Sequence, residues 1–244
     1  MIVLYDSSFE GFLTLVYKVY YEKITPSKII KTYPDTLVLE EIVEIKTHSI
    51  QAKKVLDALK KEFTRKNFES IFHIFMCDSK EFELHLLHFI LLGFKDQKQL
   101  SNINYPFIFT IQNLLKEFFR HNHKMTGFVR FIELEDTTLY AKVDSKFNVI
   151  YFLGKHFLKR FNNQNYIIHD IERKIAFIKN NDFIGVQEVT NFEEPKISDD
   201  EQKFSKLWQT FFKSVAIESR KNTNLQRQLV PLLYRTYMNE FCEN

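Results

Sequence analysis

The polar residues whose types and spacing most clearly indicate a chemical role lie in a run without acidic residues, over residues 219–239. Guanidinium, ammonium and amide groups are the side chains that contact phosphates and base edges in nucleic-acid complexes. The run therefore predicts a nucleic-acid-binding surface, with a solvated basic tail as the alternative interpretation. The side chains that we expect to contact the nucleic acid are Arg220, Lys221, Asn222, Gln226 and Arg227, helped by Arg130 and Arg160.

The charges of the chain are segregated along its length. The 34 lysines and arginines nearly balance the 31 acids, so the formal net charge is only +3. Residues 188–201 hold six acids and one base, a net charge of −5, whereas residues 203–235 hold seven bases and one acid, a net charge of +6. Favourable interaction with a helix dipole explains the acids from Asp199 to Glu201, but it does not explain the acid-free run.

Four residues are candidates for general acid–base catalysis, namely Asp6, Glu10, His169 and Asp170. Adjacent side chains of a regular strand point to opposite faces, so His169 and Asp170 form a dyad only if the turn begins at Asp170. The alternative is structural, with Asp170 starting the hairpin turn and His169 hydrogen-bonded near the sheet. The chain has no phosphate-cradling glycine loop, GxSxG elbow or HExxH motif, so the catalytic residues are unknown and enzymatic activity is an open question.

Two pairs of residues have the helical spacing of zinc ligands. His73 and Cys77 are at i, i+4, and His85 and His88 are at i, i+3. No CxxC accompanies them and their segment is otherwise apolar. This favours histidines with ordinary hydrogen-bond partners in the core or at the surface over metal ligands. We therefore predict no metal site and no cofactor.

Cysteine content and hydropathy indicate the compartment. Cys77 and Cys242 are too few for a disulfide framework, which is typical of a reducing environment. The first residues lack the basic and apolar layout of a signal peptide, and the apolar runs, such as residues 89–92, are far shorter than the roughly 18 residues of a membrane span. These features predict a cytoplasmic protein.

Hydrophobic periodicity predicts a mostly helical first half. A strand over residues 2–5 precedes the capping box Ser7-x-x-Glu10 and a helix that stops before Pro26. A second strand is expected over residues 37–43, then a helix over 52–63. One or two buried helices follow over 68–93, with Gly93 as the C-terminal cap, and a further helix over 107–118.

In the second half of the chain, the spacing of hydrophobic residues changes to the two-residue period that is typical of strands. Residues 128–134 and 139–143 predict one antiparallel hairpin, and residues 166–171 and 174–178 a second, with a helix near 154–161 between them. The capping box Ser198-x-x-Glu201 then opens an amphipathic helix. Its apolar stripe is ordinarily core, and consists of Phe204, Leu207, Trp208, Phe211, Phe212 and Val215.

The expected fold class is α+β. A mostly helical first half packs with a small antiparallel sheet built from hairpins in the second half, and an amphipathic helix follows near the C-terminus. We expect residues 1–244 to form a single intimately packed domain, with a possible sub-boundary near residues 188–201.

Four segments together resemble a bacterial family of unknown function. They are YDSSFEGFL at residues 5–13, GFVRFIELED at 127–136, YIIHDIERKIA at 166–176 and AIESRKNTNLQRQLVPLLY at 216–234. The family is described as DNA metabolism or DNA repair proteins linked to a radical SAM protein encoded nearby, and some members are fused to a uracil-DNA glycosylase. Three departures stand out: Ser7 replaces a usual glycine, Thr223 a usual proline, and Leu232-Leu233 occupy a usually basic place.

The resemblance implies a DNA-related role by association. Our first hypothesis is a DNA repair or DNA metabolism accessory protein that binds DNA and acts with the radical SAM partner. We expect no association with a membrane. The second is an enzyme acting on damaged DNA, such as a glycosylase or lyase. The third is a protein-interaction subunit without DNA binding.

Overall fold

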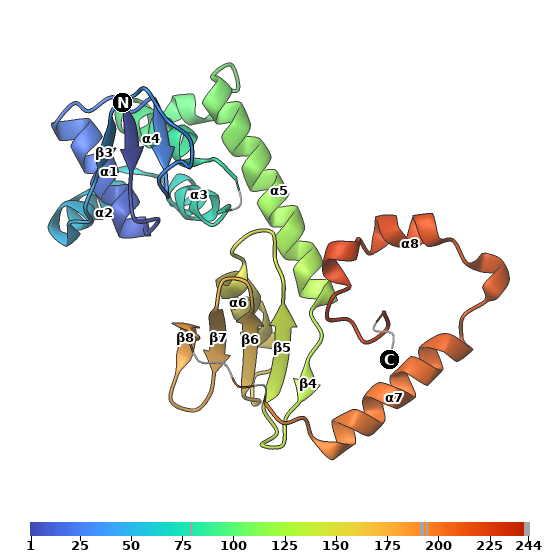
Figure 1. Cartoon of the computed structure of the whole chain (residues 1–244). Coiled ribbons are helices and arrows are strands. Elements are labelled where there is room, and N and C mark those ends of the chain that lie inside the picture. The colour runs from blue at the N-terminus through green and yellow to red at the C-terminus, as the bar shows by residue number, and fades with distance from the viewer. Residues whose placement is uncertain (79, 191–192, 194, 242–244) are drawn as a thin grey trace. The chain divides into compact units, whose positions relative to one another are not determined.

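The computed structural model describes all residues except 79, 191–192, 194 and 242–244 (Figure 1). It divides the chain into two compact units, Met1–Phe118 and Phe119–Asn244. Both contain helices and a small sheet, so the α+β prediction is confirmed. The prediction of one intimately packed domain concerns how the two units pack, and it stays a prediction. The sub-boundary suggested near 188–201 includes residues 191, 192 and 194, which lie outside the described residues.

The first unit is built on a three-stranded parallel sheet with β1 in the centre. All three side chains of β1 are buried, as the apolar start of the chain predicts. The strands are β1 (Ile2–Leu4), β2 (Lys28–Ile30) and β3 (Ile42–Glu44). The helices are α1 (Phe9–Tyr21), α2 (Ser49–Glu62), α3 (Arg65–Phe75), α4 (Glu83–Lys95), the short 3-10 helix η1 (Gln97–Ser101) and α5 (Pro106–Phe128), which continues into the second unit.

Three local predictions for this unit are wrong. The cap of α1 is Ser8, whose hydroxyl accepts from the Gly11 amide at 2.9 Å, because Ser7 instead adopts a left-handed backbone with φ of 64°. The strand expected over residues 37–43 starts only at Ile42. Gly93 lies inside α4 rather than after it, and a Cβ there would meet the Phe63 ring at 2.3 Å, so the glycine serves close packing.

The second unit contains a five-stranded sheet of order β4-β5-β6-β7-β8 (Figure 1). Both predicted hairpins are confirmed, since β4 pairs antiparallel with β5 and β6 with β7. Two features were not predicted: the strand β8 and the parallel pairing of β5 with β6. The bounds are β4 (Ile132–Glu133), β5 (Leu139–Val143), α6 (Ile150–Arg160), β6 (Tyr166–Asp170), β7 (Ile175–Lys179) and β8 (Ile184–Glu188).

Helix α6 packs on this sheet through a glycine. A Cβ on Gly154 would meet the Phe177 ring at 2.1 Å, so only a bare backbone fits there. The hydroxyl of Tyr166 donates to the Gly154 carbonyl at 2.8 Å, and the Tyr166 and Phe177 rings stack with centroids 6.0 Å apart. Burial raises the pKa of Tyr166 to about 12, so the hydroxyl stays protonated and keeps this bond at neutral pH.

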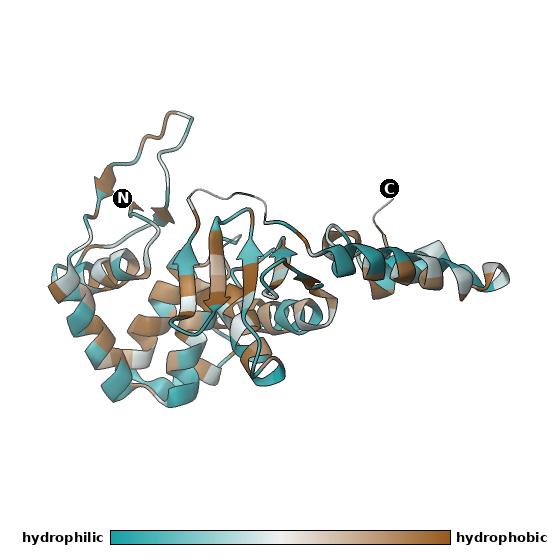
Figure 2. Cartoon of the chain, turned by 90° about the horizontal axis from the view of Figure 1, so that it is seen from below, coloured by the Kyte–Doolittle hydropathy of each residue, from teal (hydrophilic) through white to brown (hydrophobic). Residues whose placement is uncertain are grey.

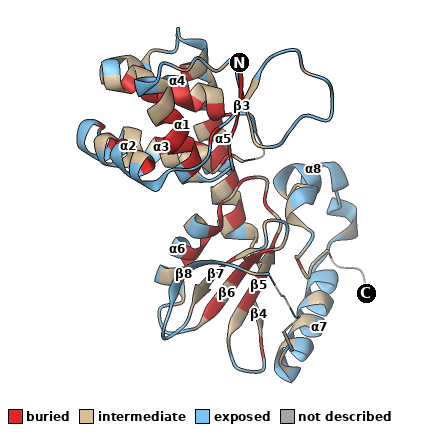
Figure 3. Ribbon diagram, turned by 60° about the vertical axis from the view of Figure 1, so that its left-hand side comes forward, coloured by how far each residue is buried: buried red, intermediate tan, exposed pale blue. Residues whose placement is uncertain are grey.

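The chain ends in the helices α7 (Asp199–Ser214), η2 (Glu218–Arg220), α8 (Thr223–Leu229) and η3 (Leu232–Tyr234). Ser198 caps α7 as predicted, because its hydroxyl accepts from the Glu201 amide at 3.1 Å. The expectation that the apolar stripe of α7 is core is wrong. No residue of α7 is buried, and Phe204 is 67% exposed (Figure 3).

No helix of the described residues is both long and apolar enough to cross a membrane.

Candidate nucleic-acid interface

The five residues that the basic run predicts as a binding surface lie on η2, on the turn after it and on α8. Asn222 caps α8, because its side-chain oxygen accepts from the Leu225 amide at 2.9 Å. This cap fixes the turn between η2 and α8 and places basic side chains on both sides of it. Arg220, Lys221, Asn222, Gln226 and Arg227 are all exposed.

All of these side chains except Arg227 line a groove of about 600 Å³ between the end of α7 and α8. Its walls combine two chemistries, with apolar side chains beside cationic and amide groups. The apolar part consists of Phe212, Val215, Ala216, Ile217, Leu225 and Leu229, and the polar part of Lys213, Arg220, Lys221, Asn222 and Gln226. We name this surface the α7–α8 groove.

Two exposed guanidinium groups of this region have no carboxylate partner among the described side chains. Neither Arg220 nor Arg227 forms an ion pair with a carboxylate among those side chains, whereas Lys203, earlier in the run, pairs with Asp200 at 2.9 Å. An exposed guanidinium without a carboxylate neighbour is available to a phosphate, which it can bind with two parallel hydrogen bonds. The groove is therefore suited to an anionic polymer.

Arg130 is engaged elsewhere in the second unit. Its guanidinium binds Glu240 at 3.0 Å and the Gly127 carbonyl at 3.1 Å, and the Glu240 side chain is nearly buried. Arg130 therefore anchors the C-terminal segment to the end of α5. Arg160 is exposed at the end of α6, which packs on the sheet away from α8 (Figures 1 and 3). Neither arginine lines the α7–α8 groove.

His169 and Asp170 are buried and take structural roles. Asp170 accepts from the Arg173 amide and from its guanidinium, both at 3.0 Å, at the start of the β6–β7 turn. His169 Nδ1 lies 3.0 Å from the Tyr140 hydroxyl on the neighbouring strand. With exposed fractions of 3% and 0%, the two residues offer a substrate no accessible acid–base pair, and the structural interpretation of this dipeptide is confirmed.

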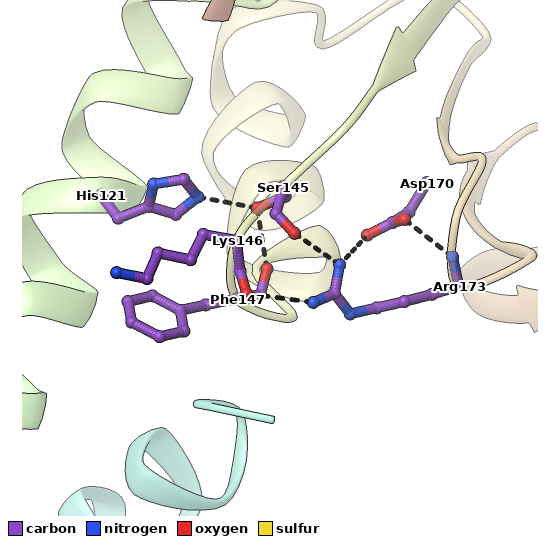
Figure 4. Close-up of polar contacts among 6 residues, drawn as sticks. All are labelled: His121, Ser145, Lys146, Phe147, Asp170 and Arg173. Atoms are coloured by element: carbon purple, nitrogen blue, oxygen red, sulfur yellow. Dashed lines mark hydrogen bonds and ion pairs between the residues drawn. The ribbon is translucent and has the colours of Figure 1, made fainter. Parts of the chain in front are cut away.

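Arg173 connects this turn to the loop after β5 (Figure 4). Its guanidinium donates to the Ser145 carbonyl at 2.7 Å and the Lys146 carbonyl at 3.2 Å, in addition to Asp170. The carboxyl ends of β5 and β6 lie at the same sheet edge because the two strands are parallel. The role of Arg173 could not be predicted from the sequence, because the parallel pairing of β5 with β6 leaves no local signal.

A serine–histidine contact lies on the other side of the same loop (Figure 4). His121 Nε2 is 2.8 Å from Ser145 Oγ, and His121 Nδ1 is 2.8 Å from the Tyr234 hydroxyl. The Ser145 hydroxyl donates to the Phe147 carbonyl at 2.7 Å, and with a neutral His121 this arrangement is completed by donation from Nε2 to Ser145 and acceptance by Nδ1 from Tyr234. This direction is the reverse of nucleophile activation, and Ser145 is buried.

Asp6 and Glu10 belong to the first unit. Asp6 accepts from the hydroxyls of Thr47 at 2.5 Å and Ser8 at 2.7 Å. Partial burial alone would raise the pKa of Asp6, but these hydrogen bonds outweigh it and hold the pKa below its ordinary value. A carboxylate stabilised in its charged form is a poor general acid at neutral pH. Glu10 is exposed in the first turn of α1.

The predicted metal-type residues do not assemble. Cys77 is buried, whereas His88 is exposed as a residue, and partial desolvation lowers the pKa values of both His73 and His88. Within the described residues, no group of three or more histidine, cysteine or acidic side chains could hold a metal ion. Cys242 lies outside those residues.

Comparison with known protein families identifies the family of this chain. The model of a family described as a domain of unknown function, DUF4130, matches residues 80–240, about two thirds of the chain. No curated protein matches the sequence.

Proposed function

We propose that this chain, which belongs to the DUF4130 family of unknown function, is a nucleic-acid-binding accessory protein of DNA repair or DNA metabolism. The observation that carries the proposal is the α7–α8 groove, which Arg220 and Lys221 line, with Arg227 exposed nearby on α8 in the same acid-free run. Cationic and amide groups in this arrangement suit contacts with the sugar–phosphate backbone, which position a protein without specifying sequence.

The resemblance of the four sequence segments supplies the biological setting of the proposal. It suggests DNA as the polymer and a radical SAM protein as the partner that performs the chemistry. His169 and Asp170 are buried in the second unit and are inaccessible to a damaged base. This burial supports an accessory role over an enzymatic one.

The test is binding to fluorescent single-stranded, double-stranded and uracil-containing DNA over a series of salt concentrations. Binding should weaken steeply with salt, because each neutralised phosphate releases condensed counterions. Replacing Arg220, Lys221 and Arg227 together by glutamine should reduce the slope of log K against log salt by about 2 to 3, roughly 0.9 for each lost contact with duplex DNA. Absence of binding to all three DNAs at low salt would overturn the proposal.

The matched control replaces three exposed lysines of α2 in the first unit, Lys53, Lys54 and Lys60, by glutamine. This variant loses the same charge, so a general electrostatic effect would change both slopes equally. An unchanged slope in the control and a reduced slope in the groove variant is the expected result. Asn222 is left intact in both variants because it caps α8.

A further inference from the structure

A cavity of about 390 Å³ lies within the second unit, between helix α7, strands β4 and β5 and the C-terminal residues 236–239. Two hydrogen bonds join its helical side to its C-terminal side. Ser205 Oγ accepts from the Asn239 amide group at 3.1 Å, and Gln209 donates to the Asn239 carbonyl at 3.3 Å. A volume of this size lies in the range of small-molecule sites.

The face of α7 that lines this cavity is hydrophilic. Gln202, Lys206 and Gln209 follow the i, i+4, i+7 spacing of one helical face, and Ser205 lies among them. Hydrophilic teal residues accordingly recur along the C-terminal helices in Figure 2. An ordinary surface helix turns its polar side to bulk solvent. A polar face turned toward a cavity of its own unit therefore indicates a polar occupant.

The sheet supplies a partly apolar wall with an aromatic ring. Tyr140 of β5 is only 2% exposed, and its hydroxyl already lies 3.0 Å from His169 Nδ1, so its ring is the surface that it can offer a ligand. Ile132 of β4 and Ile197 lie beside it, and the half-buried Tyr237 adds a second ring from the C-terminal side. Rings and aliphatic side chains of this kind suit the face of a planar heteroaromatic ring.

The charges of the lining favour an anion. Arg130, Lys142 and Lys206 line the cavity together with a single acid, Glu201. Glu240 compensates the charge of Arg130, so two lysines and one carboxylate remain. Lys206 is exposed and forms no ion pair with a carboxylate of the described residues, so its ammonium group is available to a ligand.

The polar groups of the lining are mostly hydrogen-bond donors. The two carboxylate oxygens of Glu201 accept from the Ser205 hydroxyl at 2.9 Å and from the Glu133 amide at 3.2 Å. Burial, and secondarily the charge of Asp144, raise the pKa of Tyr237, so its hydroxyl is protonated and can donate at neutral pH. Ammonium and hydroxyl donors bind phosphate oxygens, whereas an amide such as that of Gln202 can both donate to and accept from the edge of a base.

We propose that this cavity binds a phosphorylated nucleoside, either free or as an unpaired nucleotide of a nucleic-acid strand. The base packs against the rings of Tyr140 and Tyr237 and bonds to Gln202, and the phosphate binds Lys206 near the charge of Lys142. The site lies on the inner side of α7, not in the α7–α8 groove, so it goes beyond the proposed function and is tested without DNA.

Isothermal titration calorimetry of the full chain tests the ligand class. The probes are the four deoxynucleoside 5′-monophosphates, the four nucleosides without phosphate, and inorganic phosphate. At least one nucleotide should bind about tenfold tighter than its nucleoside and than inorganic phosphate, because each of these offers only one half of the contacts.

Substitutions on α7 locate the site. Lys206→Gln should weaken nucleotide binding about tenfold, because it removes a charge-assisted hydrogen bond to the phosphate. The matched control Lys203→Gln loses the same charge from the same helix, but Lys203 pairs with Asp200 and does not line the cavity, so binding should be unchanged. Circular dichroism checks folding, which both variants should preserve because α7 buries none of its side chains.

Two further variants separate the contacts and the proposals. Tyr237→Phe keeps the ring and removes the hydroxyl, and should weaken nucleotide binding about three- to tenfold. The triple glutamine variant of the α7–α8 groove should bind the mononucleotide as the original chain does, so loss of DNA binding and loss of this site are distinguishable. A single-stranded oligonucleotide that displaces the mononucleotide identifies the strand as the source, and one that does not identifies a free nucleotide.

Three results would overturn the inference. One is the absence of binding of all four nucleotides up to about 1 mM. Another is binding of inorganic phosphate or of the nucleosides as tight as that of the nucleotides, which would show that one half of the ligand suffices. The last is equal weakening by Lys203→Gln and Lys206→Gln, which would place the ligand outside the cavity.

Discussion

The backbone of Ser7 stores a small amount of strain at the start of the first unit. Its φ of 64° lies in the left-handed region, which costs a residue with a side chain about 1–2 kcal/mol. The turn brings the Asp6 carboxylate against Gly11, where a Cβ would approach Asp6 Oδ1 to 2.1 Å. A serine at position 7 therefore carries a stability cost at a tight turn.

Ser7→Gly should stabilise the chain by up to about 1 kcal/mol, since relief of strain exceeds the added entropy of the unfolded glycine. Urea unfolding measures this change. Ser7→Ala keeps the side chain at positive φ and should give no gain, and a gain equal to that of glycine would rule out backbone strain as the cause.

The protonation of His169 makes stability depend on pH. Burial, and secondarily the charge of Lys142, lower the pKa of His169 below its ordinary value of 6.5. As pH falls through 6.5, the unfolded chain binds a proton at this histidine before the folded chain does. The contribution of His169 to stability is therefore fully present above pH 6.5 and is lost as pH falls from 6.5 toward the lower pKa of the folded state.

His169→Gln should therefore reduce the loss of unfolding free energy between pH 7.5 and pH 5.5. The loss should not vanish, because burial lowers the pKa values of His73 and His88 in the same direction. Urea titrations of both proteins at the two pH values measure the difference, and equal losses would show that His169 titrates normally in the folded state.

At the scale of elements, the contact of α6 with β7 depends on the missing side chain of Gly154. Gly154→Ala would force a methyl group into the Phe177 ring, and overpacking of this kind costs about 1–3 kcal/mol. Gly127→Ala is the matched control, because it lies in α5 with nothing within 4 Å of its Cβ position. Thermal unfolding should show a lower midpoint for the first variant and an equal or slightly higher one for the second, since alanine favours a helix over glycine by about 0.5–1 kcal/mol.

Local patterns predicted most elements, and the failures have physical causes. Alternation and turn residues located both hairpins, and the Ser198 cap located the start of α7. The exposed Leu37 and Leu39 mimic a strand because alternation does not reveal whether the apolar side is covered. The same ambiguity placed the α7 stripe in the core, since an amphipathic pattern does not say which molecule covers it.

Some residues of the candidate site could be predicted from the sequence and others could not. The run from Arg220 to Arg227 could be found from sequence because η2 and α8 are neighbours along the chain. The engagement of Arg130 with Glu240 could not, because these residues are 110 positions apart. Arg173 and His121 were missed for the same reason, as their partners belong to other elements of the fold.

At the scale of the whole molecule, the division of the chain into two compact units predicts that damage to one unit is felt mainly within it. Leu59 of α2 is fully buried in the first unit, and Leu59→Ala should cost about 2–5 kcal/mol. Hydrogen exchange should then accelerate in residues 1–118 and remain slow in β6 and β7. Equal acceleration in both units would instead show that the chain unfolds as one cooperative domain, as sequence analysis predicts.

The parallel pairing of β5 with β6 sets the order in which the second sheet can assemble. Strands β6, β7 and β8 are joined by short turns, and hairpins close in about 1–10 μs. β5 pairs with β6 only after α6 has crossed between them, which closes a longer loop. We therefore expect two half-sheets with open edges to precede the finished one. A chain still emerging from the ribosome is then most prone to misassociate until α6 docks and joins the halves.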